Sequence, residues 1–408
     1  MLPTFSIAGL VLPSALIFVV TAVVALHVTR SALLAFGLAT IKCGTFFIYY
    51  GYVFDGTFTF LDDWAYLRLG EELVDQDIHW FNLLENLERV FAISGGEHIV
   101  YILHNASAIR LFGHGYFAPV ALNIVATVLV AWWGTRLAVA ERWCPPPLSA
   151  ALFCFLLLHP DLLAWSIVMN GKDVLVLLLH VVLLWAAASY YRGRRLVALI
   201  LAAVATLALF YLRFYVPFLF ALSFALVAIF QARGWSRLRV SVLAAALLGG
   251  AMFWIGGEVM GFSLHQIGSN LVDPAYGLVR FLLTPIPFHT ERAYEFLDLP
   301  AVLHWILLPF ACLGVWRIGH MRTPFVRFFV VYVAVFVALY AVYAELQEPR
   351  HRVQLDYALA ICQFVGLWQV LRLRGFDEDA ELRLATSHPL RPSAPPSCPA
   401  KPLGEHTA

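Results

Sequence analysis

Two adjacent carboxylates are the first candidates for chemistry in this sequence. Asp62 and Asp63 lie in the segment FLDDWAY (60–66), which also contains Tyr66, and LRLGEEL follows it. The aromatic flanks and this continuation indicate a loop that leads into a helix at a membrane surface. Aspartates at such a point serve either as helix caps or as a general base or metal-binding acid. The sequence leaves both interpretations open.

Basic residues accumulate in three later segments that border apolar runs. These segments are NGKD (170–173) with Lys172 and Asp173, YLRFY (211–215) with Arg213, and EPRHR (348–352) with Arg350, His351 and Arg352. A guanidinium in a tight turn has few partners besides a headgroup, a carboxylate or a bound phosphate, and its planar fork suits phosphate. A snorkelling lysine, a capping aspartate and lipid headgroup contacts are the simpler explanations. For EPRHR, the sharper alternative is a phosphate or pyrophosphate clamp.

The composition identifies the elements that must position these groups. Of the 408 residues, 61% are hydrophobic and 13% are charged, whereas a soluble domain carries about 25% charged residues. Apolar stretches of about 20 residues, long enough to cross a bilayer core of ~30 Å, recur from end to end. We therefore predict an all-α polytopic integral membrane protein. The net charge of +1 gives no reason to expect a nucleic-acid partner, and the six scattered cysteines do not form a zinc or disulfide pattern.

About eleven transmembrane helices are predicted from the apolar runs. The expected spans are 7–28, 32–54, 116–135, 147–159, 174–190, 196–212, 215–231, 240–260, 301–316, 326–344 and 353–371. The fourth is short, and His159-Pro160 interrupts it, so it is expected to continue to about Met169 as a kinked helix. Lys42 is the one cation deep in an apolar run. It is expected to pair with a carboxylate across the bundle or to snorkel.

The arginines in short loops predict the orientation. They follow the odd-numbered spans, so they share one side, which the positive-inside rule assigns to the cytoplasm. The N-terminus is then outside and the C-terminus cytoplasmic. A transmembrane domain is expected over 1–375, with outer loops at 55–115 and 261–300. The remainder, 376–408, is acidic and then Pro-rich, and we predict a disordered cytoplasmic tail.

In their order along the chain, these groups resemble the GT-C superfamily of membrane glycosyltransferases, in a form similar to glycosyltransferase family 39. The resemblance rests on Asp62-Asp63 with Tyr66 in the first large outer loop, then Lys172-Asp173, Arg213 and EPRHR. It implies a GT-C-like bundle with interfacial helices in the outer loops, in a bacterial inner membrane. Two features depart from the superfamily: no soluble C-terminal domain is expected, and two apolar spans precede the acidic motif.

The resemblance also implies an activity and roles for residues. The enzyme would move a sugar from a polyprenyl-phosphate donor to a glycan, lipid or protein acceptor on the non-cytoplasmic face. Asp62 or Asp63 would be the catalytic base, with a divalent cation as a candidate cofactor. The residues implied to bind substrate or phosphate are Tyr66, Lys172, Asp173, Arg213, Arg350, His351 and Arg352.

Two other functions fit parts of the pattern. A polymerase or ligase of lipid-linked glycans, of the O-antigen type, would also place arginines around a diphosphate, but an acidic pair would not be its leading feature. A transporter or flippase predicts polar residues and broken helices near the membrane midplane. Lys42 is the only cation expected at that depth, which weighs against transport.

Overall fold

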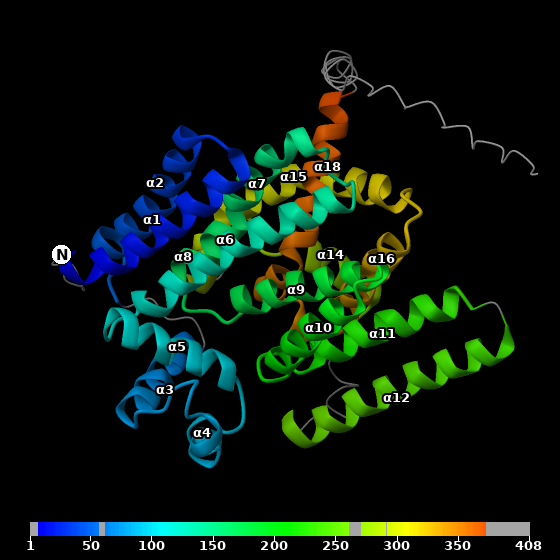
Figure 1. The fold of residues 1–408 in the computed structure, drawn as a ribbon, viewed down its shortest axis with the longest axis horizontal. Helices are drawn as coiled ribbons and strands as arrows, with labels where there is room; N and C mark the ends of the chain where they lie inside the picture. The colour runs from blue at the N-terminus through cyan, green and yellow to red at the C-terminus, as the bar shows by residue number, and fades with distance from the viewer. Residues whose placement is uncertain (1–6, 57–61, 233, 261–270, 291, 373–408) are drawn as a thin grey trace, which may run out of the picture. The chain divides into compact units, whose positions relative to one another are not determined.

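The fold is helical throughout the residues that the computed structural model describes, which are 7–56, 62–232, 234–260, 271–290 and 292–372 (Figure 1). In these ranges the only β-type pairing is an isolated bridge between Leu271 and Tyr343. The chain divides into two compact units, Met1–Gly366 and Leu367–Ala408. Residues 376–408, for which a disordered tail is predicted, lie outside the described residues, as do 261–270 of the second outer loop.

Helices occupy all of the predicted apolar runs, and further helices lie in the predicted outer loops 55–115 and 261–300. The α-helices are α1 (Ile7–Thr29), α2 (Ala32–Ile48), α3 (Asp63–Asp75), α4 (Leu87–Ser94), α5 (Ile99–Phe112), α6 (Phe117–Ala140), α7 (Ser149–Leu157), α8 (Pro160–Val168), α9 (Asp173–Tyr191), α10 (Arg195–Phe210), α11 (Tyr215–Phe230), α12 (Trp235–Met260), α14 (Pro274–Leu283), α15 (Asp298–Gly319), α16 (Pro324–Val342), α17 (Pro349–Arg352) and α18 (Asp356–Arg372). Shorter helical turns are η1 (Tyr49–Val53), η2 (Leu84–Asn86), η3 (Pro146–Leu148), η4 (Arg292–Leu297), η5 (Ala344–Leu346) and η6 (Val353–Leu355).

Several of these helices can cross a membrane, which confirms the prediction of a membrane protein. By length and apolarity they are Ile7–Thr29, Ala32–Val53, Phe117–Ala140, Asp173–Tyr191, Tyr294–Gly319 and Pro324–Val342, or seven spans if α7 and α8 form one. A helix or helix pair occurs at each of the eleven predicted ranges, but eleven crossings are not confirmed. With 16 residues each, α10 and α11 reach only ~24 Å, short of a ~30 Å core.

The fourth predicted span is broken where the sequence indicates. Helix α7 ends at Leu157, and α8 begins at Pro160, with a bend of 43° between them. Proline is well suited to the first turn of a helix because it has no N–H to leave unpaired, but it cannot continue the preceding helix. The break positions His159 and Asp161 inside the protein, where both are buried.

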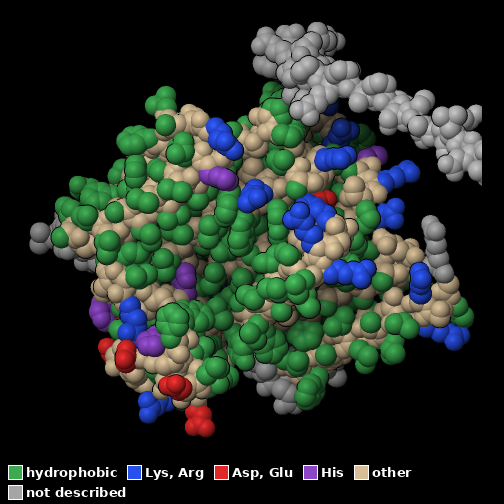
Figure 2. Space-filling view, viewed as in Figure 1, with side chains coloured by type: hydrophobic (Ala, Val, Ile, Leu, Met, Phe, Trp, Pro, Cys, Tyr) green, Lys and Arg blue, Asp and Glu red, His purple; other side chains and the backbone are tan. Residues whose placement is uncertain are grey.

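The centre of the first unit is formed by α6 and α9, whose spans are the most buried of the six, whereas the spans that contain α1 and α2 are among the least buried. Figure 2 shows hydrophobic side chains across much of one face, with most Lys and Arg of that face toward the upper right and Asp and Glu toward the lower left, around α3 and α4.

Within the described residues, Lys42 neither pairs with a carboxylate nor snorkels, the two alternatives expected from the sequence. It is buried, and its ammonium donates to the Thr127 hydroxyl of α6 at 3.2 Å rather than to a carboxylate or to solvent.

Helix α3, which begins with the acidic pair, is fixed against α5. At Gly70 a Cβ atom would lie 2.7 Å from Cβ of Asn105, so only glycine permits this close approach. Asn105 is itself buried and donates to the carbonyl of Tyr101. The contact therefore sets the position of the N-terminal end of α3, where the acidic pair lies.

Candidate functional site

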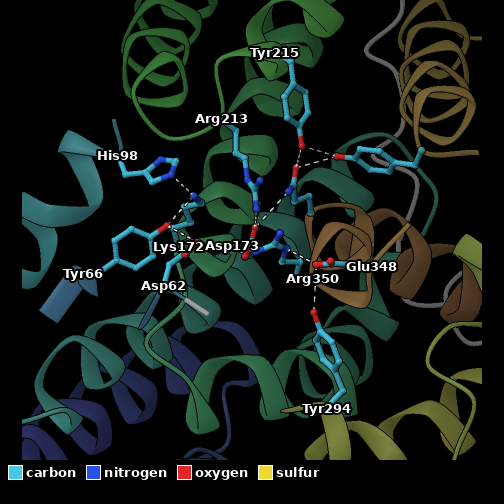
Figure 3. Close-up of polar contacts among 12 residues, drawn as sticks. Asp62, Tyr66, His98, Lys172, Asp173, Arg213, Tyr215, Tyr294, Glu348 and Arg350 are labelled. Carbon is cyan, nitrogen blue, oxygen red and sulfur yellow. Dashed lines mark hydrogen bonds and ion pairs between the residues drawn. The ribbon is translucent and has the colours of Figure 1, made fainter. Parts of the chain in front are cut away.

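One pocket gathers residues from four separate parts of the chain (Figure 3). They come from the N-terminal end of α3, the segment before α9, the turn between α10 and α11, and α17. Its lining residues are Asp62, Asp63, Tyr66, Met169, Gly171, Lys172, Asp173, Arg213 and Arg350. Seven of the nine residues singled out in the sequence thus lie together, although up to 288 positions separate them (350 minus 62). The pocket encloses about 20 Å³, room for about one water molecule.

The two aspartates face different surroundings. Asp63 is 2% exposed, and its carboxylate accepts hydrogen bonds from the Tyr116 hydroxyl at 2.5 Å and from the backbone N–H of Trp64 at 2.8 Å. Asp62 is 53% exposed, makes no capping hydrogen bond with its side chain and accepts from the Tyr66 hydroxyl at 3.4 Å. Asp63 therefore stabilises the loop, and Asp62 presents its carboxylate to the pocket.

Asn170, the first residue of NGKD, joins the elements around Asp63. Its side-chain NH₂ donates to the carbonyl of Asp63 at 3.0 Å and to Oδ1 of Asn105 at 2.8 Å, and its own oxygen accepts from the Tyr101 hydroxyl at 2.7 Å. Its backbone N–H donates to the hydroxyl of Tyr116 at 3.0 Å. Because every one of these groups is buried and paired, the network fixes the segment that carries Lys172.

Lys172 is a buried cation whose hydrogen-bond partners are neutral. Its Nζ donates to the Tyr66 hydroxyl at 2.8 Å and lies 2.5 Å from Nε2 of His98. Among the described residues, no carboxylate oxygen lies within 4.0 Å of it. Burial, reinforced by the positive charge of Arg213, lowers the pKa of Lys172 to about 7. An anion in the pocket would relieve this unfavourable charge.

Arg213 and Asp173 form a buried ion pair. The Arg213 NH2 group donates to Oδ1 of Asp173 at 2.8 Å, and the side chains are only 13% and 5% exposed. Nε2 of Gln354 donates to the same oxygen at 3.3 Å. Nε of Arg213 is buried without a hydrogen-bond partner among the described residues, so one donor of the guanidinium is unused there.

Arg350 is the most exposed of the three cations. Its Nε lies 2.7 Å from Oε2 of Glu348, which also accepts from the Tyr294 hydroxyl at 3.3 Å. Its NH1 lies 4.0 Å from Oδ2 of Asp62. Arg350 therefore spans the pocket between two carboxylates (Figure 3), and its displacement would enlarge the space for a ligand.

The other two predicted site residues of EPRHR, His351 and Arg352, do not line the pocket. Arg352 is 1% exposed and donates to the carbonyl of Thr284 and, at 3.5 Å, to Oδ1 of Asp161. His351 is buried beside the Tyr340 ring, 5.9 Å between centroids. Burial and the nearby Arg213 hold the pKa of His351 well below its usual value. The expected phosphate contact by Arg352 thus has no support in its position: this guanidinium anchors α17 instead.

His98 is a site residue that the sequence reasoning missed. It precedes α5 with a left-handed backbone (φ 53°), after Gly95 and Gly96, which also have positive φ. The run GGEH (95–98) is the only signal, since consecutive glycines mark a turn that other residues rarely form. Glu348 belongs to EPRHR, but the sequence does not indicate its contact with Arg350.

Two of the three aspartates of the pocket already have other partners. Asp63 pairs with Tyr116 and Asp173 with Arg213. Over the part of the chain that the structure describes, no group of three or more His, Cys, Asp or Glu side chains is arranged to hold a metal ion. The divalent cation implied by the resemblance has no obvious ligand set here.

Comparison of this chain with protein-family models, with curated proteins and with solved structures finds no match.

Proposed function

We propose that this protein is a membrane glycosyltransferase of the GT-C type, which transfers a sugar from a polyprenyl-phosphate donor to a hydroxyl acceptor. The observation that carries the proposal is the combination, in one pocket, of an exposed carboxylate with three cations. Asp62 faces Arg350, and Lys172 and Arg213 line the same space. Glycosyl transfer from a phosphate requires a base for the acceptor and positive charge for the leaving group.

Asp62 is the base in this proposal. Its carboxylate takes the proton of the acceptor hydroxyl as the acceptor oxygen bonds to the anomeric carbon. The bond between that carbon and the phosphate oxygen breaks, and the phosphate leaves with the electron pair. Exposure favours Asp62, since the Asp63 carboxylate is buried against Tyr116. Without rearrangement of α3, an acceptor hydroxyl can reach the carboxylate of Asp62 but not that of Asp63.

The cations stabilise the negative charge on the leaving phosphate. Lys172 contributes most, because neutral groups alone contact its ammonium, whereas Arg213 is already paired with Asp173. Arg350 acts after it exchanges Glu348 for a phosphate oxygen. This exchange also provides space, since the pocket at about 20 Å³ has room for only about one water molecule.

The proposal includes the topology of eleven spans with the N-terminus outside, in a bacterial inner membrane. Under it, the pocket is at the outer surface: Asp62 follows α2, Lys172 precedes α9, Arg213 joins α10 to α11, and Arg350 precedes α18. A lipid-linked phosphate lies at such a surface.

The test is a transfer assay with purified protein in lipid and radiolabelled polyprenyl-phosphate sugars. We expect Asp62→Asn to lower the rate by about 10²–10⁴-fold, the usual contribution of a general base, and Arg350→Ala to lower it as well. Asp75→Asn, on the exposed C-terminal end of the same helix, is the matched control and should keep wild-type activity. Asp63→Asn tests the assignment between the two aspartates, because its defect should be in folding.

Other outcomes separate the alternatives. Untouched donors, or an Asp62→Asn variant as active as wild type, would refute the transferase. Loss on arginine substitution alone, with glycan chain growth retained in Asp62→Asn, would point to a polymerase or ligase. Movement of intact lipid-linked sugar across the bilayer would point to a flippase.

A further inference from the structure

His98 contacts the proposed phosphate site from a loop that no motif identifies. Its Nε2 lies 2.5 Å from Nζ of Lys172, and its ring packs edge to face against Tyr66 with centroids 5.6 Å apart (Figure 3). The side chain is 20% exposed. His98 and Tyr66 thus hold the Lys172 ammonium between them.

The histidine is neutral. Burial together with the charge of Lys172 lowers its pKa to about 3. Neutral imidazole has one N–H donor and one acceptor nitrogen. In the tautomer that carries its N–H on Nδ1, Nε2 accepts from the Lys172 ammonium at 2.5 Å.

The backbone conformation that places His98 beside Lys172 is energetically unfavourable. Gly95, Gly96 and His98 all have positive φ, at 63°, 84° and 53°. A non-glycine residue in that region is unfavourable unless the surrounding structure fixes it, and such residues are frequent at functional sites. The strained residue is the one that contacts Lys172.

We propose that His98 is a positioning residue of this site: its Nε2 holds the Lys172 ammonium charged and directed at the pocket, where it binds a phosphate oxygen of the lipid-linked donor. This inference rests on the proposed function for the identity of the ligand. The contact with Lys172 itself does not depend on it.

Charged and titratable groups surround Lys172 from every packed element. They are Asp62 and Tyr66 of α3, Glu97 and His98 before α5, Asp173 of α9, Arg213 between α10 and α11, and Arg350 and His351 of α17. The arginines and burial oppose the ammonium, and the aspartates favour it. Loss of the acceptor nitrogen of His98 should therefore shift Lys172 further toward its neutral form.

The first measurement is the titration of Lys172 itself, by competitive labelling with an amine reagent and mass spectrometry. The chain has only three lysines, Lys42, Lys172 and Lys401, so the peptide is unambiguous. We compare wild type with His98→Gln, which keeps an acceptor oxygen, and His98→Leu, which has similar bulk and no acceptor. The midpoint, near pH 7 in wild type, should fall by about one pH unit in His98→Leu and less in His98→Gln. His114→Gln, at an exposed histidine, is the control.

The second measurement is binding of a sugar-free polyprenyl monophosphate in nanodiscs between pH 6 and 9. Wild-type affinity should fall as the pH rises above 7, because the neutral lysine no longer attracts the phosphate. In His98→Leu the fall should begin at lower pH, with affinity at pH 7.5 reduced up to about tenfold, because a midpoint lower by about one unit leaves up to about tenfold less charged lysine. His98→Gln should recover part of it.

The two proposals fail in different ways. An unchanged Lys172 midpoint in a folded His98→Leu protein, or a fall in His98→Gln as large as that in His98→Leu, would overturn the role of His98, even if the phosphate binds. A shifted midpoint in a protein that does not bind the phosphate would leave the Lys172 contact established and refute the ligand, and with it the proposed function.

Discussion

The buried pair of Arg213 and Asp173 should contribute far more to stability than an exposed pair of the same chemistry. Asp173→Asn keeps the size of the side chain and removes its charge, which leaves a guanidinium that is 13% exposed without a counterion. Removal of one partner from a buried ion pair costs about 3–5 kcal/mol. The asparagine oxygen can still accept from Arg213, so we expect the lower end, about 3 kcal/mol.

The chain supplies its own control. Arg110 and Asp77 also form an arginine–aspartate pair, at 3.0 Å compared with 2.8 Å, but the side chains are 31% and 81% exposed. An exposed pair contributes about 0–1 kcal/mol. Asp77→Asn should therefore lower the free energy of unfolding by less than about 1 kcal/mol.

The assay is equilibrium unfolding in mixed micelles of increasing denaturing-detergent fraction, followed by the fluorescence of the 12 tryptophans. The double variant Asp173→Asn/Arg213→Gln should lose less stability than the sum of the single losses, because the uncompensated charge is gone. Equal effects of Asp173→Asn and Asp77→Asn, or strict additivity in the double variant, would refute the reasoning from burial.

Two further predictions concern packing between helices. Lys42→Met should raise the free energy of unfolding by about 1 kcal/mol or more in the same assay, because a buried ammonium with one hydroxyl partner is unfavourable. Thr127 keeps its own hydrogen bond to the carbonyl of Ile124 in the variant. A loss of stability would contradict this prediction. Gly314→Ala should lower the free energy of unfolding by about 1–3 kcal/mol through overpacking, since its Cβ would lie 1.8 Å from the backbone oxygen of Cys362. The control is Gly37→Ala, whose Cβ would have nothing within 4 Å, and it should be neutral or slightly stabilising.

The positions of the helices and the meeting of the site residues were predictable because both follow from apolar runs. A run of about 20 apolar residues forms a helix in a bilayer since no other element satisfies its backbone there. Polar residues excluded from the spans then collect at helix ends. Asp62, Lys172 and Arg213 all border such runs, and the structure brings them together.

Side-chain direction was not predictable, because it depends on local helical register. Arg350 and Arg352 are two positions apart on α17, which separates them by ~200° around a helix. They cannot both face the pocket, and only Arg350 does. Asp62 and Asp63 both line the pocket, but the sequence did not show that Asp62 is exposed and Asp63 buried. The position of His98 was harder still to predict, because it depends on a turn with positive φ. The glycines permit this turn but do not specify it.

The charges of the pocket indicate which cation a phosphate would depend on most. Arg213 has Asp173, and Arg350 has Glu348, so each guanidinium already has a carboxylate. Lys172 has a hydroxyl and an imidazole. A phosphate must compete with carboxylates for the arginines, whereas at the lysine it replaces nothing charged. The lysine, rather than the more conspicuous arginine cluster, should therefore dominate the binding of an anionic ligand.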